Sequence, residues 1–184
     1  MLAEAFHDLH ASRLHGFALL VTLGDARRAE RAAGEALAHG GEQARALRHP
    51  ERAAAWLRAR VLRAVRRSNH RERPDAGSRL AALRSLGVDQ STYDGFAALS
   101  ITARAALVAS AVERFETIDV ETIIGADAPR TRRLIERARA GYLAVAAKPP
   151  SGQEGVPPAG PDGPLAARVR SAASWAMTGA GPSR

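Results

Sequence analysis

Residues 118–143, IDVETIIGADAPRTRRLIERARAGYL, carry the clearest structural signal in the chain. They predict a short helix over 119–124, a tight turn at Gly125-Ala126-Asp127, and a longer helix that Pro129 opens and that runs to about Ala147. Two helices joined by a short glycine-containing turn form a DNA-binding unit whose second helix enters the major groove. The same pattern also fits an ordinary helical hairpin with a basic, solvated face, and the motif alone leaves both interpretations open.

The second helix of this unit begins with a cluster of arginines. Arginine can hold guanine or a phosphate through two parallel hydrogen bonds, so arginines at this end of the helix predict contacts with DNA. Arg130 and Arg133 lie three positions apart and share a face that we expect to point toward the groove, whereas Arg132 is expected to point toward a phosphate. The predicted DNA contacts of this helix are Arg130, Thr131, Arg132, Arg133 and Arg137.

Helical patterning continues in the N-terminal part of the chain. Apolar residues recur at helical spacing over 3–22. Asp25 is a suitable cap for a second helix that extends to about Leu37 and that His39-Gly40-Gly41 is expected to end. A third helix is predicted from about Pro50 to Arg67. The predicted structure is helical throughout.

The third helix predicts a second contact with nucleic acid. It lies in the most cationic part of the chain and combines arginines with a tryptophan, a composition that can bind single-stranded DNA by charge and stacking. Trp56 also stands beside Ala55 and Leu57, so packing in the core is the simpler interpretation of its ring. The predicted contacts of this helix are Trp56, Arg58, Arg60 and Arg63.

The patterns divide the chain into two small helical domains joined by a flexible linker, an all-α fold. The first domain is predicted over 1–67, and the second, with the helix-turn-helix, over 96–147. The linker, 68–95, begins with a polar stretch and includes a short helix near 79–86. Residues 148–184 form a tail rich in proline and glycine, with a short helix predicted over 165–177.

The composition supports this fold and limits the function. Hydrophobic residues make up 46% and aromatic residues 4% of the chain, and the dominance of alanine, leucine and arginine favours helices over sheets. A formal net charge of +8 fits a nucleic-acid partner, although a GC-rich genome produces the same arginine bias. There is no cysteine, so disulfides and thiolate metal sites are excluded.

The sequence lacks the motifs that are typical of other classes of function. The sequence contains no glycine-rich phosphate loop and no HExxH pattern, and its histidines are not paired with carboxylates at ligand spacing. We therefore expect no enzyme, no cofactor, no metal site and no small-molecule substrate. No apolar run approaches the roughly 20 residues of a membrane helix. The N-terminus does not look like a signal peptide, so we expect a cytoplasmic protein without a membrane partner.

The order of these parts resembles the extracytoplasmic-function sigma factors of bacterial RNA polymerase. Residues 14–40, LHGFALLVTLGDARRAERAAGEALAHG, are similar to the paired helices of their region two. Residues 53–67, AAAWLRARVLRAVRR, are similar to the family's helix that carries Trp-Leu. Residues 98–115, ALSITARAALVASAVERF, together with 118–143, are similar to region four. No single motif is specific, and the resemblance depends on order and spacing.

The resemblance implies a sigma subunit that recognises promoter DNA together with core RNA polymerase. It implies that the third helix holds the melted strand and that the helix after Pro129 binds the upstream promoter element. It also implies that the second helix docks on polymerase. The residues that it assigns to this docking are Glu30, Arg31, Gly34 and Glu35.

The second helix also departs from the family pattern. Arg31 stands where the family usually has an acid, and Gly34 stands where it usually has glutamine. These differences motivate an alternative function, a sigma-like regulatory protein that binds an anti-sigma factor or another regulator without initiating transcription. A third interpretation is a plain helix-turn-helix protein that binds DNA without polymerase.

Overall fold

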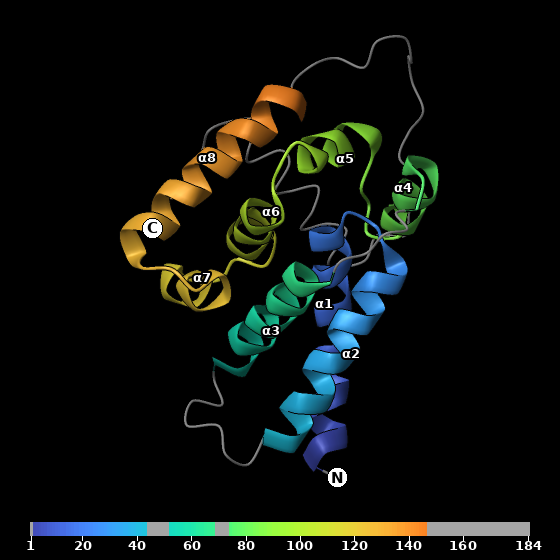
Figure 1. The fold of residues 1–184 in the computed structure, drawn as a ribbon, viewed down its shortest axis with the longest axis vertical. Helices are drawn as coiled ribbons and strands as arrows, with labels where there is room; N and C mark the ends of the chain where they lie inside the picture. The colour runs from blue at the N-terminus through green and yellow to red at the C-terminus, as the bar shows by residue number, and fades with distance from the viewer. Residues whose placement is uncertain (1, 44–51, 69–73, 147–184) are drawn as a thin grey trace.

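The computed structural model describes residues 2–43, 52–68 and 74–146, with side chains described over 10–41, 52–68 and 74–146. Every regular element in these ranges is a helix, which confirms the predicted all-α class (Figure 1). The α-helices are α1 (Leu2–Thr22), α2 (Ala26–Gln43), α3 (Ala53–Arg67), α4 (Ala76–Arg84), α5 (Gln90–Ala97), α6 (Ile101–Leu107), α7 (Thr117–Ile124) and α8 (Ala128–Ala146). A π-helical turn, Val108–Val112, continues α6. The predicted tail over 148–184 lies outside the described residues.

A tight turn folds α2 back against α1. Leu23 and Gly24 both have positive φ, and the Gly24 amide donates to the Leu19 carbonyl at 2.9 Å, which closes α1. The buried Asp25 then caps α2, because its carboxylate accepts from the Arg28 amide at 3.1 Å. A Cβ on Gly24 would lie 2.1 Å from the carbonyl oxygen of Arg79 in α4, so this position requires glycine.

The expected end of the second helix at His39-Gly40-Gly41 is wrong. Helix α2 passes through both glycines and ends at Gln43. Gly40 is buried, so tertiary packing outweighs the low helix propensity of glycine at this position.

The C-terminal half of the fold is built around α8. Helices α5 and α6 both pack on α8 (Figure 1). Between α5 and α8, the Phe96 and Tyr142 rings lie 5.4 Å apart at an interplanar angle of 56°. The sequence patterns did not predict α5, whose first residues fall within the expected linker. Asp89 caps it by accepting from the Thr92 amide at 2.7 Å.

The two halves of the chain contact each other through a shared core. The buried apolar side chains of α1, α2 and α3 belong to the same cluster as those of α6, α7 and α8. Arg104 of α6 is buried and donates to the carbonyls of Val21 at 2.6 Å, Phe96 at 2.9 Å and Leu99 at 2.9 Å. Burial lowers the pKa of Arg104 to about 10, so it stays charged at neutral pH. That each half folds as an independent domain stays a prediction.

Candidate nucleic-acid interface

The unit formed by α7, its turn and α8 is fixed by two helix caps. Gly125 ends α7 with φ of 70°, and its amide donates to the Glu121 carbonyl at 2.8 Å. Asp127 begins α8, because its carboxylate accepts from the Arg130 amide at 2.9 Å. The helix starts at Ala128, one residue before the predicted Pro129. The predicted order of helix, glycine turn and helix is therefore present, with defined ends on both sides of the turn.

The arginines of α8 lie on its surface. Arg130 is 81% exposed and pairs with Asp127 at 3.7 Å, and the Arg137 side chain donates to the Arg133 carbonyl at 3.3 Å. Arg130, Arg133 and Arg137 follow the i, i+3, i+7 spacing of one helix face. The buried stripe of α8 lies elsewhere on the helix and contains Thr131, Ala138, Tyr142 and Ala146. Helix α8 therefore carries a row of exposed guanidiniums on one face, while its buried stripe packs against the core.

Thr131 was predicted to contact DNA, and the structure corrects this. Its exposed fraction is 0%, and its hydroxyl donates to the Ala126 carbonyl at 3.5 Å. Thr131 lies on the stripe of α8 that faces the core, so the side chain supports the turn and is not available to a groove.

Arg58 was predicted to hold a single strand, and the structure corrects this as well. Its exposed fraction is 2%, its guanidinium is paired with Glu113, and it donates to the Ala54 carbonyl at 2.9 Å. The guanidinium carbon also lies 4.9 Å from the centre of the Phe115 ring and 5.6 Å from that of Phe17. Arg58 therefore connects α3 to the residues after α6.

The other predicted residues of α3 lie nearer the surface. Trp56 is partly buried against the core, stacked on His39 at 6.0 Å, with Arg60 lying over its ring at 5.1 Å. A base could stack on this indole only by displacing one of these neighbours. Arg63 is exposed. Burial, followed by the positive charges of Arg63 and Arg67, lowers the pKa of Arg60.

The residues assigned to polymerase docking share the outer face of α2. Glu30, Arg31, Gly34 and Glu35 are all exposed. A Cβ on Gly34 would meet nothing within 4 Å, so a larger side chain fits there without rearrangement. Arg31 and Glu35 also line a small hollow against the C-terminal end of α3. The structure therefore brings the predicted α2 surface next to α3.

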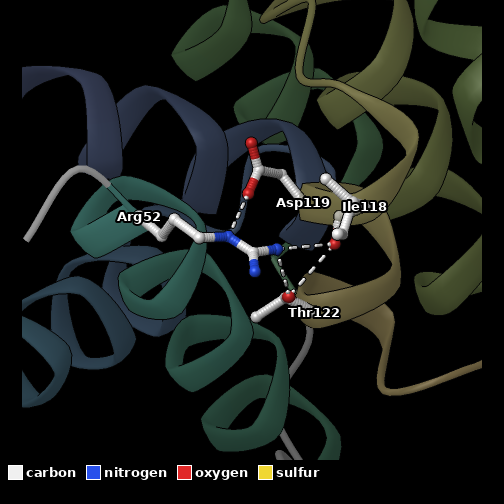
Figure 2. Close-up of polar contacts among 4 residues, drawn as sticks. All are labelled: Arg52, Ile118, Asp119 and Thr122. Carbon is white, nitrogen blue, oxygen red and sulfur yellow. Dashed lines mark hydrogen bonds and ion pairs between the residues drawn. The ribbon is translucent and has the colours of Figure 1, made fainter. Parts of the chain in front are cut away.

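A contact between α3 and α7 was not predicted from the sequence. Figure 2 shows Arg52, the residue before α3, reaching α7. Its Nε lies 3.0 Å from Oδ1 of Asp119, and its Nη2 donates to the Ile118 carbonyl at 3.0 Å and to Oγ1 of Thr122 at 3.1 Å. Arg52 and Asp119 are 67 residues apart in the chain, and no local pattern signals such a pair.

The described residues give no sign of a metal centre or a membrane span. No group of three or more His, Asp or Glu side chains within them is placed to hold a metal ion. No helix among them is long and apolar enough to cross a membrane. No family model, curated protein or solved structure matches this chain.

Proposed function

We propose that the chain is a DNA-binding transcription initiation factor of the sigma type, with α7 and α8 acting as its helix-turn-helix. The observation that carries the proposal is the row of exposed arginines on α8, which starts at the capped turn. Arg130, Arg133 and Arg137 share one face, and Arg132 lies beside them. A helix that enters the major groove uses residues near its N-terminus to contact the bases and phosphates.

The packing of α8 suits this role. Tyr142 and Ala138 are nearly fully buried, with exposed fractions of 2% and 1%, and Thr131 is fully buried. A recognition helix that is held by its core stripe loses little conformational entropy on binding, so its arginines can contribute to affinity. The proposed promoter contact is therefore a preformed surface.

The outer face of α2 is the proposed contact with core RNA polymerase. Glu30 and Glu35 supply acidic groups on this face, and Arg31 places a positive charge between them. In the sigma family the position of Arg31 usually carries an acid, so we expect polymerase binding weaker than in family members with that acid. The cytoplasm is the proposed location because the partner polymerase is there.

DNA binding tests the proposal directly. DNA selected from a random pool by the full chain would be labelled, and binding would be followed by fluorescence anisotropy at several salt concentrations. Replacing both Arg130 and Arg133 with Ala should weaken binding and reduce the salt dependence, because contacts with phosphates and bases are lost. Arg84→Ala, at an exposed arginine of α4, is the matched control and should bind as the parent does. Equal losses in the two variants would contradict the proposal.

A second candidate function has an observation in its favour. Arg58 is buried in a pair with Glu113, and α7 packs on α3. Part of the surface that was predicted to hold a melted strand is thus engaged within the protein. This arrangement favours a sigma-like regulatory protein that binds an anti-sigma factor or another regulator. Loss of run-off transcription, with retention of a regulator that co-purifies from the host, would distinguish this function from initiation.

A further inference from the structure

A cavity of about 440 Å³ opens between α3 and α7. The α3 wall is one continuous stripe of side chains at helical spacing, Ala59, Leu62, Arg63, Arg66 and Arg67, and the other wall is the end of α7, Thr122, Ile123, Ile124 and Gly125. Its volume lies in the range of pockets that hold small organic ligands. The cavity includes none of the arginines of α8, so it is distinct from the proposed contact of α8 with DNA, and it shares only Arg63 with the predicted single-strand contacts of α3.

Within the described residues, no carboxylate neutralises the charge of the α3 wall. Arg63, Arg66 and Arg67 are exposed, and no carboxylate in the described ranges forms an ion pair with any of them. Arg66 and Arg67 lie in the last turn of α3, where positive charge also stabilises the helix dipole. Stabilisation of the helix dipole does not explain the position of Arg63, which lies one turn earlier. It also does not explain why Arg63, Arg66 and Arg67 line the same cavity. The three guanidiniums form a positively charged wall.

The α7 wall offers different chemistry. Leu62, Ile123 and Ile124 line the cavity, but their exposed fractions are only 2%, 2% and 7%, so each offers a ligand no more than a small apolar contact. The carbonyls in the last turn of an α-helix have no partner within the helix. The Glu121 carbonyl of α7 already accepts from the Gly125 and Ala126 amides, so only the carbonyls of Thr122, Ile123 and Ile124 can serve a ligand as hydrogen-bond acceptors. An inorganic anion would use only the arginines. A ligand that uses both walls has phosphates at one end and a flat, partly apolar group with N–H or O–H donors at the other.

We propose that the cavity between α3 and α7 binds a nucleoside polyphosphate, with the phosphates on Arg63, Arg66 and Arg67 and the nucleoside against the end of α7. Guanidinium groups recognise phosphate through paired, charge-assisted hydrogen bonds. Because the ligand contacts both α3 and α7, its binding stabilises the packing of the two halves of the chain. The proposal goes beyond promoter recognition and does not depend on it.

Calorimetric titration of the full chain with ATP, without divalent cations, tests the proposal. We expect saturable binding of one ATP per chain, weaker binding of adenosine and of inorganic tripolyphosphate, and a rise in melting temperature with ATP. Arg63→Gln and Arg66→Gln should each weaken binding roughly tenfold or more, since each removes hydrogen bonds to a charged group. Ala59→Trp, which fills the cavity without changing its charge, should also weaken binding. Arg84→Gln, an exposed arginine of α4 outside the cavity, should leave the affinity unchanged.

Four results would overturn the proposal. The first is the absence of saturable ATP binding, and the second is an equal loss of affinity in Arg84→Gln. The third is tripolyphosphate binding as tight as that of ATP, because the α7 wall would then contribute nothing. The fourth is a single-stranded oligonucleotide that binds through Arg63 and Arg66 while ATP does not, which would assign this wall to nucleic acid. Arg63 and Arg66 have exposed side chains, so circular dichroism should show folded variants throughout.

Discussion

Arg58 and Glu113 form an ion pair in which both side chains are almost completely buried, with exposed fractions of 3% and 5%. They are 55 residues apart in the chain and join α3 to the segment between α6 and α7. A buried charge that loses its partner is costly, so Glu113→Gln should lower the free energy of unfolding by about 3–5 kcal/mol. Urea denaturation measures this change.

The pair between Arg52 and Asp119 provides the comparison. It joins the same halves, but its side chains are 35% and 22% exposed. Water and salt screen such a pair, so Arg52→Met should cost only roughly 0–1 kcal/mol. A cost as small as this for Glu113→Gln would show that the buried pair does not stabilise the contact between the halves.

His10 should make stability depend on pH. Burial, followed by the positive charges of Arg58 and Arg13, lowers the pKa of His10 below its ordinary value of 6.5. The unfolded chain then binds this proton more tightly than the folded protein, so the free energy of unfolding rises with pH across the interval between the two pKa values. The stabilising contribution is complete above pH 6.5 and is lost as the pH falls below it.

Urea denaturation of His10→Gln at about pH 7.5 and about pH 5.5 checks this dependence. We expect a smaller loss of stability on acidification than in the parent protein. His15→Gln, at an exposed histidine of the same helix, should keep the parent's pH dependence. If His15→Gln and not His10→Gln flattened the profile, the assignment to His10 would be wrong.

The exposed arginines of α8 should divide their roles. Arg133 shares a face with Arg130, whereas Arg132 is rotated from it by about 100° on the helix. Arg133→Ala should cost roughly 1–3 kcal/mol of binding and relax the sequence preference, because it removes contacts with bases. Arg132→Ala should weaken all DNA alike and reduce the salt slope. Anisotropy titrations against selected and scrambled duplexes measure both effects; equal, sequence-independent losses would show only a basic face.

Local signals predicted two of the turns, wrongly placed a helix end at His39-Gly40-Gly41, and did not predict the long-range contacts. The cap at Asp25 and the turn at Gly125-Ala126-Asp127 are predictable from the sequence because a glycine that can adopt positive φ and an aspartate cap are properties of neighbouring residues. Helix α5 was missed because its eight residues carry a weak apolar pattern and depend on packing against α8.

The predicted DNA contacts show the same difference between local patterns and long-range contacts. Arg58 was predicted to bind DNA from its positive charge alone. Its partners, Glu113 and the rings of Phe17 and Phe115, are far from it in the sequence, so no local pattern predicts these contacts. Thr131 was assigned to DNA with its arginine neighbours, although helical spacing places it on the stripe of Ala138 and Tyr142. That spacing was available in the sequence and could have identified Thr131 as a core residue.

Binding to core RNA polymerase is the most direct test of the sigma-type function. The purified chain would be mixed with core polymerase from its own host and analysed by size exclusion, with Arg31→Asp and Arg84→Asp as matched charge reversals at exposed arginines. We expect weak co-elution of the parent chain, stronger co-elution of Arg31→Asp, and no gain for Arg84→Asp. Co-elution of none of the three would contradict initiation with polymerase and favour the regulatory protein.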